Sequence, residues 1–242
     1  MKASQASQNQ ILALQQIDSD IIQLEHKIKN LPLATQLDIA SASLISARNL
    51  LIAAETEKSD IKHELSKSEV DVEQVASRIE KDEKRLAAGT GTPKELEQIQ
   101  HELGSLEKRR SELEEVELEI MVRLEGLDER IKSLTTEVLN WDSEVTKLKA
   151  QLDSELLELN VAKARDIEAR TELAKTVDSE LLQLYEKIRS TSDGVGAARL
   201  VGDKCEGCHL TMNSAEVTRI KSLSDDELVR CEECRRILIR VK

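Results

Sequence analysis

Residues 89–93, which read Gly-Thr-Gly-Thr-Pro, form the strongest helix break in the first 190 residues of this 242-residue chain. Glycine ends a helix because it adopts left-handed backbone conformations at little cost, and proline suits the first position of the next helix. Thr92 can cap that next helix, and Thr92 with Glu95 fits a capping box. The stretch therefore predicts the tip of a helical hairpin.

Apolar residues on both sides of this tip recur at alternating spacings of three and four, the heptad pattern of coiled coils. The pattern predicts helices over residues 7–31, 34–88 and 93–189, with a break at Pro32 because proline lacks an amide hydrogen. No proline interrupts the third helix. A short tip between two matching seams favours an antiparallel coiled coil within one chain over a parallel dimer of extended chains.

The composition argues against an ordinary globular core. Aromatic residues make up 1% of the chain and charged residues 34%, and there are only 8 Gly and 2 Pro. Such a composition is typical of coiled coils, which bury a narrow seam rather than a three-dimensional core. We therefore expect a mainly α fold, with a coiled-coil hairpin over residues 1–190 and a small separate unit over residues 191–242.

The formal net charge of −12 is unevenly distributed. Residues 196–242 carry nine basic and eight acidic side chains, a net of +1, whereas the remainder carries a net of −13. An acidic helical region repels phosphate, so any nucleic acid would bind the C-terminal unit. No apolar run approaches membrane-spanning length and no secretory signal opens the chain, so we expect a cytoplasmic protein with no membrane contact.

The four cysteines of the chain form two C-x2-C pairs, Cys205 with Cys208 and Cys231 with Cys234. Each pair can wrap one edge of a metal ion as a knuckle, and four thiolates complete a tetrahedron around zinc. Gly207 suits the tight turn that directs backbone amides toward sulfur. The spacing predicts one structural Zn²⁺ held by all four cysteines.

Two other uses of these cysteines are less consistent with the sequence. Disulfides are disfavoured in a reducing compartment, and a redox C-x-x-C normally opens a helix of a thioredoxin-like fold, for which the chain has too little β pattern. Catalytic zinc is disfavoured because four thiolates leave no coordination position for water. The chain also lacks a phosphate-binding glycine loop and a nucleophile elbow, so we expect no enzyme activity and no small-molecule substrate.

The flanks of the cysteine pairs predict a C4 zinc ribbon of the α+β type. Residues 197–201 and 237–241 read as strands, and Asn213 or Ser214 can cap a short helix between the pairs. His209 could replace a ligand, but a surface position is the preferred interpretation because four cysteines suffice. We expect the ribbon to have a core of its own, separate from that of the hairpin.

Basic residues gather beside the second cysteine pair. They are Arg230, Arg235, Arg236, Arg240 and Lys242. This edge could bind phosphate or an acidic protein surface, although a solvated face is slightly preferred. No aromatic residue is interleaved for base stacking, and Glu232 and Glu233 lie among the basic residues.

Three motifs carry a resemblance that covers nearly the whole chain. They are Leu14-Gln15-Gln16-Ile17-Asp18 with Leu31-Pro32, Thr92-Pro93-Lys94-Glu95-Leu96 with Gln100-His101-Glu102-Leu103, and Cys205-Glu206-Gly207-Cys208 with Cys231-Glu232-Glu233-Cys234-Arg235-Arg236-Ile237-Leu238. The chain resembles the bacterial family of C4-type zinc-ribbon proteins with a long coiled-coil hairpin, a domain of unknown function. The family's usual tip begins with an Asn and carries an aromatic residue, where this chain has Thr92 and Leu96.

The resemblance implies a structural zinc and an adaptor role, since some relatives are chaperone-like partners of the enhancer-dependent sigma factor with links to flagellar gene expression and RNA. The leading hypothesis is a non-catalytic adaptor that binds protein partners, with transcription machinery or a sigma factor as the implied class. Binding is expected at the two ends of the predicted rod, through Lys94 and Glu95 at the tip and exposed Arg235 and Arg236 on the ribbon. The alternative is a nucleic-acid-binding regulator that uses the basic edge of the ribbon.

Overall fold

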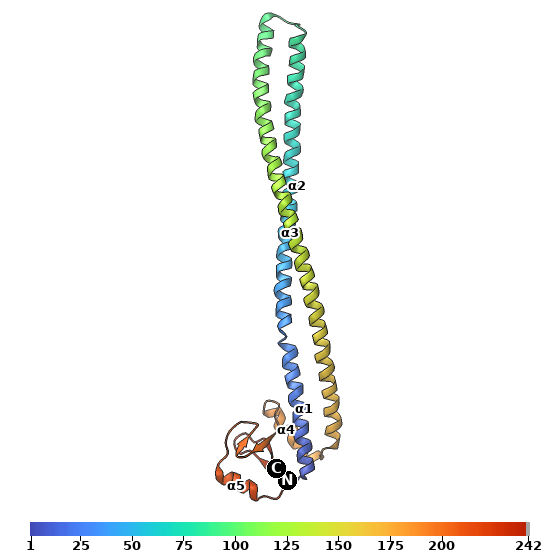
Figure 1. Cartoon of the computed structure of the whole chain (residues 1–242), viewed down its shortest axis with the longest axis vertical. Helices are drawn as coiled ribbons and strands as arrows, with labels where there is room; N and C mark the ends of the chain where they lie inside the picture. Colours follow the sequence, from blue (N-terminus) through green and yellow to red (C-terminus); the bar gives the residue numbers. More distant parts are fainter. Residues whose placement is uncertain (241–242) are drawn as a thin grey trace. The chain divides into compact units, whose positions relative to one another are not determined.

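The computed structural model describes residues 1–240 and is mainly helical, with a small four-stranded sheet near the C-terminus (Figure 1). The elements in chain order are α1 (Gln5–Lys29), α2 (Pro32–Ala87), α3 (Pro93–Thr176), α4 (Ser179–Thr191), β1 (Ala197–Val201), β2 (Lys204–Cys205), α5 (Ser214–Ser222), β3 (Val229–Arg230) and β4 (Ile237–Arg240). Two compact units share these elements. The distal unit is Gln36–Lys149, and the base unit is Met1–Thr35 together with the chain from Ala150 onward.

In the distal unit, α2 and α3 pack antiparallel along the predicted seam. The buried clusters join Ala54, Ile61 and Ile79 of α2 to Ile99, Leu103, Ile120, Leu127 and Leu134 of α3. Residues close to the tip on one helix meet residues close to the tip on the other, as Ile79 and Ile99 do. The predicted antiparallel hairpin is confirmed.

The tip forms as its residues predict. The Glu95 carboxylate accepts hydrogen bonds from the Thr92 backbone amide at 2.7 Å and from the Thr92 hydroxyl at 2.9 Å. Both bonds lower the pKa of Glu95, and the bond from the backbone amide has the larger effect. Gly89, with φ of 60°, supplies the left-handed turn just after α2 ends.

The first helical break lies where Pro32 predicts it, but a second break was not predicted. Helix α1 ends at Lys29 and α2 begins at Pro32, whereas the expected single helix over residues 93–189 ends at Thr176. Asp178 then caps α4, because its carboxylate accepts from the amides of Glu180 at 3.0 Å and Leu181 at 3.1 Å. A capping aspartate and buried Val177 therefore end the long helix without a proline.

The expectation that no apolar run approaches membrane-spanning length was wrong. Among residues 1–240, the helical run Gln5–Ala87 is long and apolar enough to cross a membrane by length and composition, with a mean hydropathy of 1.3 in its most apolar window. This is weak evidence for a span because core helices pass the same test. In α2, Ala40 and Leu44 lie in the buried seam, whereas Ile45 and Ile52 are about 60% exposed (60% and 59%).

The sheet of the base unit has the strand order β2-β1-β4-β3. Strands β1 and β4 pair in parallel, with Ala197 opposite Ile237 and Leu200 opposite Arg240, and the two short outer strands pair antiparallel. The predicted strands are therefore present over residues 197–201 and 237–240, while Val241 lies outside the described residues.

The two faces of this sheet enter two different cores. Ala197, Ile237 and Ile239 pack against the helical residues Ile11, Leu14, Leu181, Tyr185 and Ile188. Ala198, Leu200 and Leu238 pack with Met212, Val217, Ile220 and the cysteines. The ribbon therefore has a core of its own, as expected, but it is not independent of the helices, because they cover the other face of its sheet.

The first residues of the chain are also fixed to the ribbon. The Ala3 amide donates to the Asp226 carbonyl at 2.7 Å, and the Leu228 amide donates to the Met1 carbonyl at 3.3 Å. The Gln8 side-chain amide donates to the carbonyls of Ala3 and Asp225, both at 2.9 Å. The start of α1 and the segment before β3 therefore hold one another in place.

Candidate metal centre

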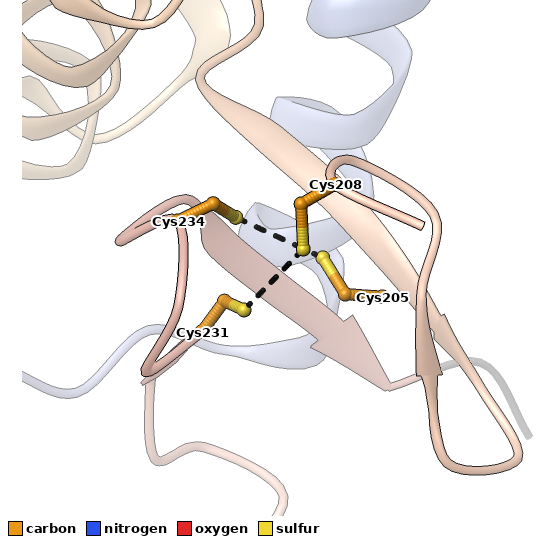
Figure 2. Close-up of side chains that lie close together, drawn as sticks. All are labelled: Cys205, Cys208, Cys231 and Cys234. Atoms are coloured by element: carbon orange, nitrogen blue, oxygen red, sulfur yellow. Dashed lines mark hydrogen bonds between the residues drawn. The ribbon is translucent and has the colours of Figure 1, made fainter. Parts of the chain in front are cut away.

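Four cysteines converge beside the β1–β4 strand pair. Cys205 ends β2 and Cys208 lies in the turn after it, whereas Cys231 directly follows β3 and Cys234 lies just before β4. Figure 2 shows their sulfur atoms pointing toward a common centre, and all four lie within 4.8 Å of one another. The sulfur atoms of Cys205 and Cys234 are 3.9 Å apart, as are those of Cys208 and Cys231.

This geometry fits one zinc ion. A tetrahedral site with Zn–S bonds of about 2.3 Å has sulfur–sulfur distances of about 3.8 Å. The observed distances of 3.9 Å match this value, and all four cysteines are free thiols rather than disulfides. The chain thus carries one structural Zn²⁺ in a C4 ribbon, where the metal ties the two knuckles together.

The buried thiols need a cation to become thiolates. Burial raises the pKa of the Cys205 thiol to about 12 and also raises the pKa of Cys231, although backbone amides directed at the two sulfur atoms oppose the rise. Those amides belong to Gly207, Cys208, Glu233 and Cys234. Burial also opposes ionisation of Cys234, but the hydrogen bonds to its sulfur atom outweigh burial and lower its pKa. The largest of these effects comes from the backbone amide of Arg236. A bound divalent cation stabilises thiolates that burial alone would disfavour.

The two knuckles share a turn geometry that the sequence did not indicate. His209 and Arg235, each directly after the second cysteine of its pair, both have a left-handed backbone with φ of 61°. Their amides donate to the carbonyls of Cys205 at 2.8 Å and Cys231 at 2.9 Å. A non-glycine residue thus supplies the left-handed position in both turns.

Gly207 matters because of close packing. A Cβ atom at this position would lie 2.9 Å from the Cβ atom of Ala198 and 2.9 Å from the Cδ atom of Arg236. Real Cβ atoms essentially never approach so closely, so a larger residue would push the first knuckle away from β1.

The side chain of Arg236 is part of the ribbon's framework. Its Nε atom donates to the Val195 carbonyl at 2.9 Å, and its two terminal nitrogens donate to the carbonyls of Gly207 at 2.9 Å and Ser192 at 3.0 Å. The expectation that Arg236 is exposed for partner binding is therefore wrong, since the side chain is half-buried.

Two other arginines of the predicted basic edge bind backbone carbonyls. Arg240 donates to the carbonyls of four residues, which are Ile220, Leu223, Ser224 and Glu227. Arg230 donates to the Arg235 carbonyl at 2.8 Å. Arg235 itself is exposed, and Lys242 lies outside the described residues. The basic edge is thus largely an internal scaffold.

The remaining candidate residues lie away from the sulfur cluster. His209 is exposed and lines a surface hollow with Val201, Lys204 and Glu206, so it does not join the four sulfur ligands. At the tip, Lys94 is exposed, whereas the Glu95 carboxylate is occupied in the capping box.

A buried polar network behind the sheet was missed. The Gln15 side-chain oxygen accepts from the amides of Gly196 at 2.6 Å and Ala197 at 3.2 Å, and its nitrogen donates to the Gly194 carbonyl at 3.2 Å. The Tyr185 hydroxyl also donates to this oxygen, at 3.2 Å. Gln15 thus connects α1 to the start of β1 and to α4.

Asp18, one turn along α1, continues the network. Its side chain is 3% exposed and accepts hydrogen bonds from the Tyr185 hydroxyl at 2.7 Å and from Arg170 at 2.9 Å, and it forms an ion pair with Arg189 at 3.4 Å. Burial and the Asp18 carboxylate raise the pKa of Tyr185. Burial opposes charge on Arg170, but its bonds to Asp18 and Glu186 outweigh this and raise its pKa. The signal in the sequence was the set of polar residues Gln8, Gln15 and Asp18 on the helix face that also carries Ile11 and Leu14.

The fold and the cysteine cluster together define a coiled-coil hairpin protein with a C4 zinc ribbon. Residues 14–193 match the family described as CT398-like coiled coil hairpin domain, and residues 204–238 match the C4-type zinc ribbon domain. The chain belongs to the CT398-like coiled coil hairpin family.

Similar proteins span the whole chain. The uncharacterized protein Rv2229c of Mycobacterium tuberculosis is 30% identical over 242 residues, covering 100% of this chain and 98% of its own length. A solved structure from Mycobacterium smegmatis is 32% identical, with a TM-score of 0.85 and full coverage of both chains. The structure of CT398 from Chlamydia trachomatis, 22% identical with a TM-score of 0.69 over 98% of each chain, shares the fold.

Proposed function

We propose that this chain is a non-catalytic cytoplasmic adaptor that binds protein partners and uses its zinc ribbon as a rigid docking platform. The closed set of four sulfur ligands carries the proposal. Because thiolates fill the coordination sphere, the metal has no position at which to activate water or a substrate. A site of this kind stabilises a surface and leaves recognition to the side chains around it.

Lys94 and Arg235 are the candidate contact residues. Both side chains are exposed, and within residues 1–240 neither forms a side-chain hydrogen bond or ion pair. The other two predicted contact residues are engaged within the fold: the Glu95 side chain in the capping box, and the Arg236 side chain in bonds to the ribbon backbone. The proposal therefore narrows the two predicted binding ends to one basic residue at each.

Protein partners are favoured over nucleic acid. The family resemblance implies transcription machinery as the partner class, including the enhancer-dependent sigma factor, and we carry this class over as part of the proposal. Three arginines of the basic edge donate hydrogen bonds to backbone carbonyls of the ribbon. A nucleic-acid phosphate would have to displace these carbonyls to bind the same donors.

The test is affinity capture from native extract with Lys94→Ala and Arg235→Ala variants of the full chain. Lys147→Ala and Arg165→Ala are matched controls, since their side chains are 65% and 78% exposed on α3. Loss of a partner in the first pair alone supports the proposal. If the controls lose the partner while Lys94→Ala and Arg235→Ala retain it, the side of the helices is the interface.

A salt titration separates the nucleic-acid alternative. Binding of RNA or DNA through several phosphates weakens steeply as salt rises. Purified full-length chain that binds single-stranded RNA in low salt, and loses it on Arg235→Ala, would support the nucleic-acid regulator instead. Equal capture of protein partners with and without nuclease treatment supports the adaptor.

A further inference from the structure

We propose that the metal centre and the helix junction formed by α1, the end of α3 and α4 are one cooperative unit, so that zinc controls the order of the junction. The strand pair β1–β4 lies between them. One face of this pair packs with the cysteines and the other packs with helical residues, among them Ile11, Leu181 and Tyr185. A displacement of either strand therefore disturbs both cores.

Arg236 is the direct link from the zinc knuckles to α4. It directly follows Arg235, two residues after the ligand Cys234, and it donates to Gly207, which lies between the ligands of the other knuckle. The same guanidinium donates to Ser192 and Val195, in the segment that joins α4 to β1. The bond to Gly207 requires the knuckles to be closed around a common centre, because Gly207 and Cys234 come from different knuckles.

Gln15 and Asp18 extend the link from this segment into the helices. Gln15 receives the amides of Gly196 and Ala197, the latter being the first residue of β1. Asp18 and Tyr185 then fix α1 against α4, and Arg170 adds the end of α3. Buried polar groups that lose their partners carry a large penalty, so the network favours the fully assembled state over a partly assembled one.

Close packing leaves little freedom for partial release. A Cβ atom on Gly196 would lie 2.7 Å from the Tyr185 ring and 2.8 Å from the Tyr185 carbonyl oxygen. The segment between α4 and β1 therefore packs closely against α4. If the knuckles open, this segment loses its hydrogen bonds from Arg236. The Gly194 carbonyl and the amides of Gly196 and Ala197 are then no longer held in place to bond the Gln15 side chain.

The primary experiment is hydrogen exchange of the full chain before and after zinc removal with a chelator. We expect exchange to rise at least about tenfold in α4 (residues 179–191) and in residues 1–18 as well as in the ribbon, with recovery on adding zinc. Residues 44–79 of the distal unit serve as the internal control and should not change. Unchanged protection of α4 in a metal-free chain whose ribbon exchanges freely would overturn the proposal.

A matched pair of variants tests the link itself. Arg236→Met keeps the aliphatic stem but removes the three donors, whereas Arg235→Met changes its exposed neighbour, whose side chain forms no such bonds. With zinc bound at one equivalent in both, we expect several-fold faster exchange in α4 for Arg236→Met only. Equal α4 exchange in the two zinc-loaded variants would show that the knuckles and the junction are independent, and the chelation experiment on the unaltered chain decides the matter if Arg236→Met fails to fold.

Discussion

The distal unit and the base unit reach stability in different ways. The distal unit repeats one motif, in which aliphatic residues of α2 meet aliphatic residues of α3. The base unit uses contacts that occur once each, such as Gln15 with β1, Asp18 with Tyr185, and the four-cysteine cluster. A repeated seam tolerates local change because neighbouring turns are equivalent, whereas a unique network has no substitute for a lost member.

Removing a zinc ligand should cause the largest loss of stability, and the loss should fall on the base unit. Cys231→Ser places a poor ligand at a position that is 1% exposed, and structural zinc contributes on the order of 10 kcal/mol to small ribbons. We expect bound zinc to fall from one per chain to near zero, measured by metal analysis of protein purified without chelator. A zinc content near zero in the reduced, folded parent chain would contradict the assignment of the site.

Cutting the buried network should rank second. Asp18→Ala leaves Arg170, Arg189 and the Tyr185 hydroxyl without their shared acceptor, and breaking a buried ion pair in this way costs about 4 kcal/mol. Asp142→Ala is the control, because it breaks an ion pair with Arg48 in which both side chains are about half exposed (53% and 54%), for less than about 1 kcal/mol. Denaturant unfolding of the two variants measures the difference, and equal losses would remove the distinction between the units.

A cavity in the distal seam should have a slightly smaller effect that stays local. Ile61→Ala truncates a residue that is 4% exposed and packs with α3, which costs about 3 kcal/mol. We expect faster hydrogen exchange in residues 54–68 and 113–127 with zinc content unchanged. Zinc loss in this variant would show that the two units do not respond separately.

The smallest expected effect is a pH dependence at the tip. Hydrogen bonds from Thr92 lower the pKa of Glu95 below its ordinary value of 4.5, so the capping box is complete above pH 4.5 and is lost as pH falls through the lower folded value. Amide exchange of residues 92–96 measured across that range should rise at acid pH in the parent chain. Glu95→Gln should remove the pH dependence, and a profile identical to that of the parent chain would assign it to another group.

The sequence predicted the parts of the molecule that depend on local spacing. The heptad pattern predicted the hairpin, the Thr92–Glu95 spacing predicted the capping box, and the two C-x2-C pairs predicted the four-sulfur cluster. Each of these patterns can be recognised within a few turns of the chain.

The parts that could not be predicted depend on partners distant in the sequence. Gln15 and Gly196 are 181 residues apart, and Asp18 and Tyr185 are 167 residues apart, so neither pairing leaves a local pattern. Arg236 was predicted to be an exposed charge because its acceptors are backbone carbonyls. Every residue has such a carbonyl, so the residue types give no sign of these bonds. The helix end at Thr176 was missed because Asp178 is as compatible with a charged helix as with a cap.

The distance in sequence between Gln15 and Gly196 also sets a delay during synthesis of the protein. A ribosome adding about 5–20 residues per second needs roughly 10–40 s to pass from one to the other. Helix α1 emerges before α3, yet its polar groups at Asp18, Gln15 and Gln8 can meet Tyr185, Gly196 and Asp225 only after these residues have left the ribosome. Before that interval ends, the distal hairpin is complete in sequence and can fold in the nascent chain. Helix α1 is therefore synthesised before the distal hairpin, yet its polar contacts can be completed only after that hairpin has been made.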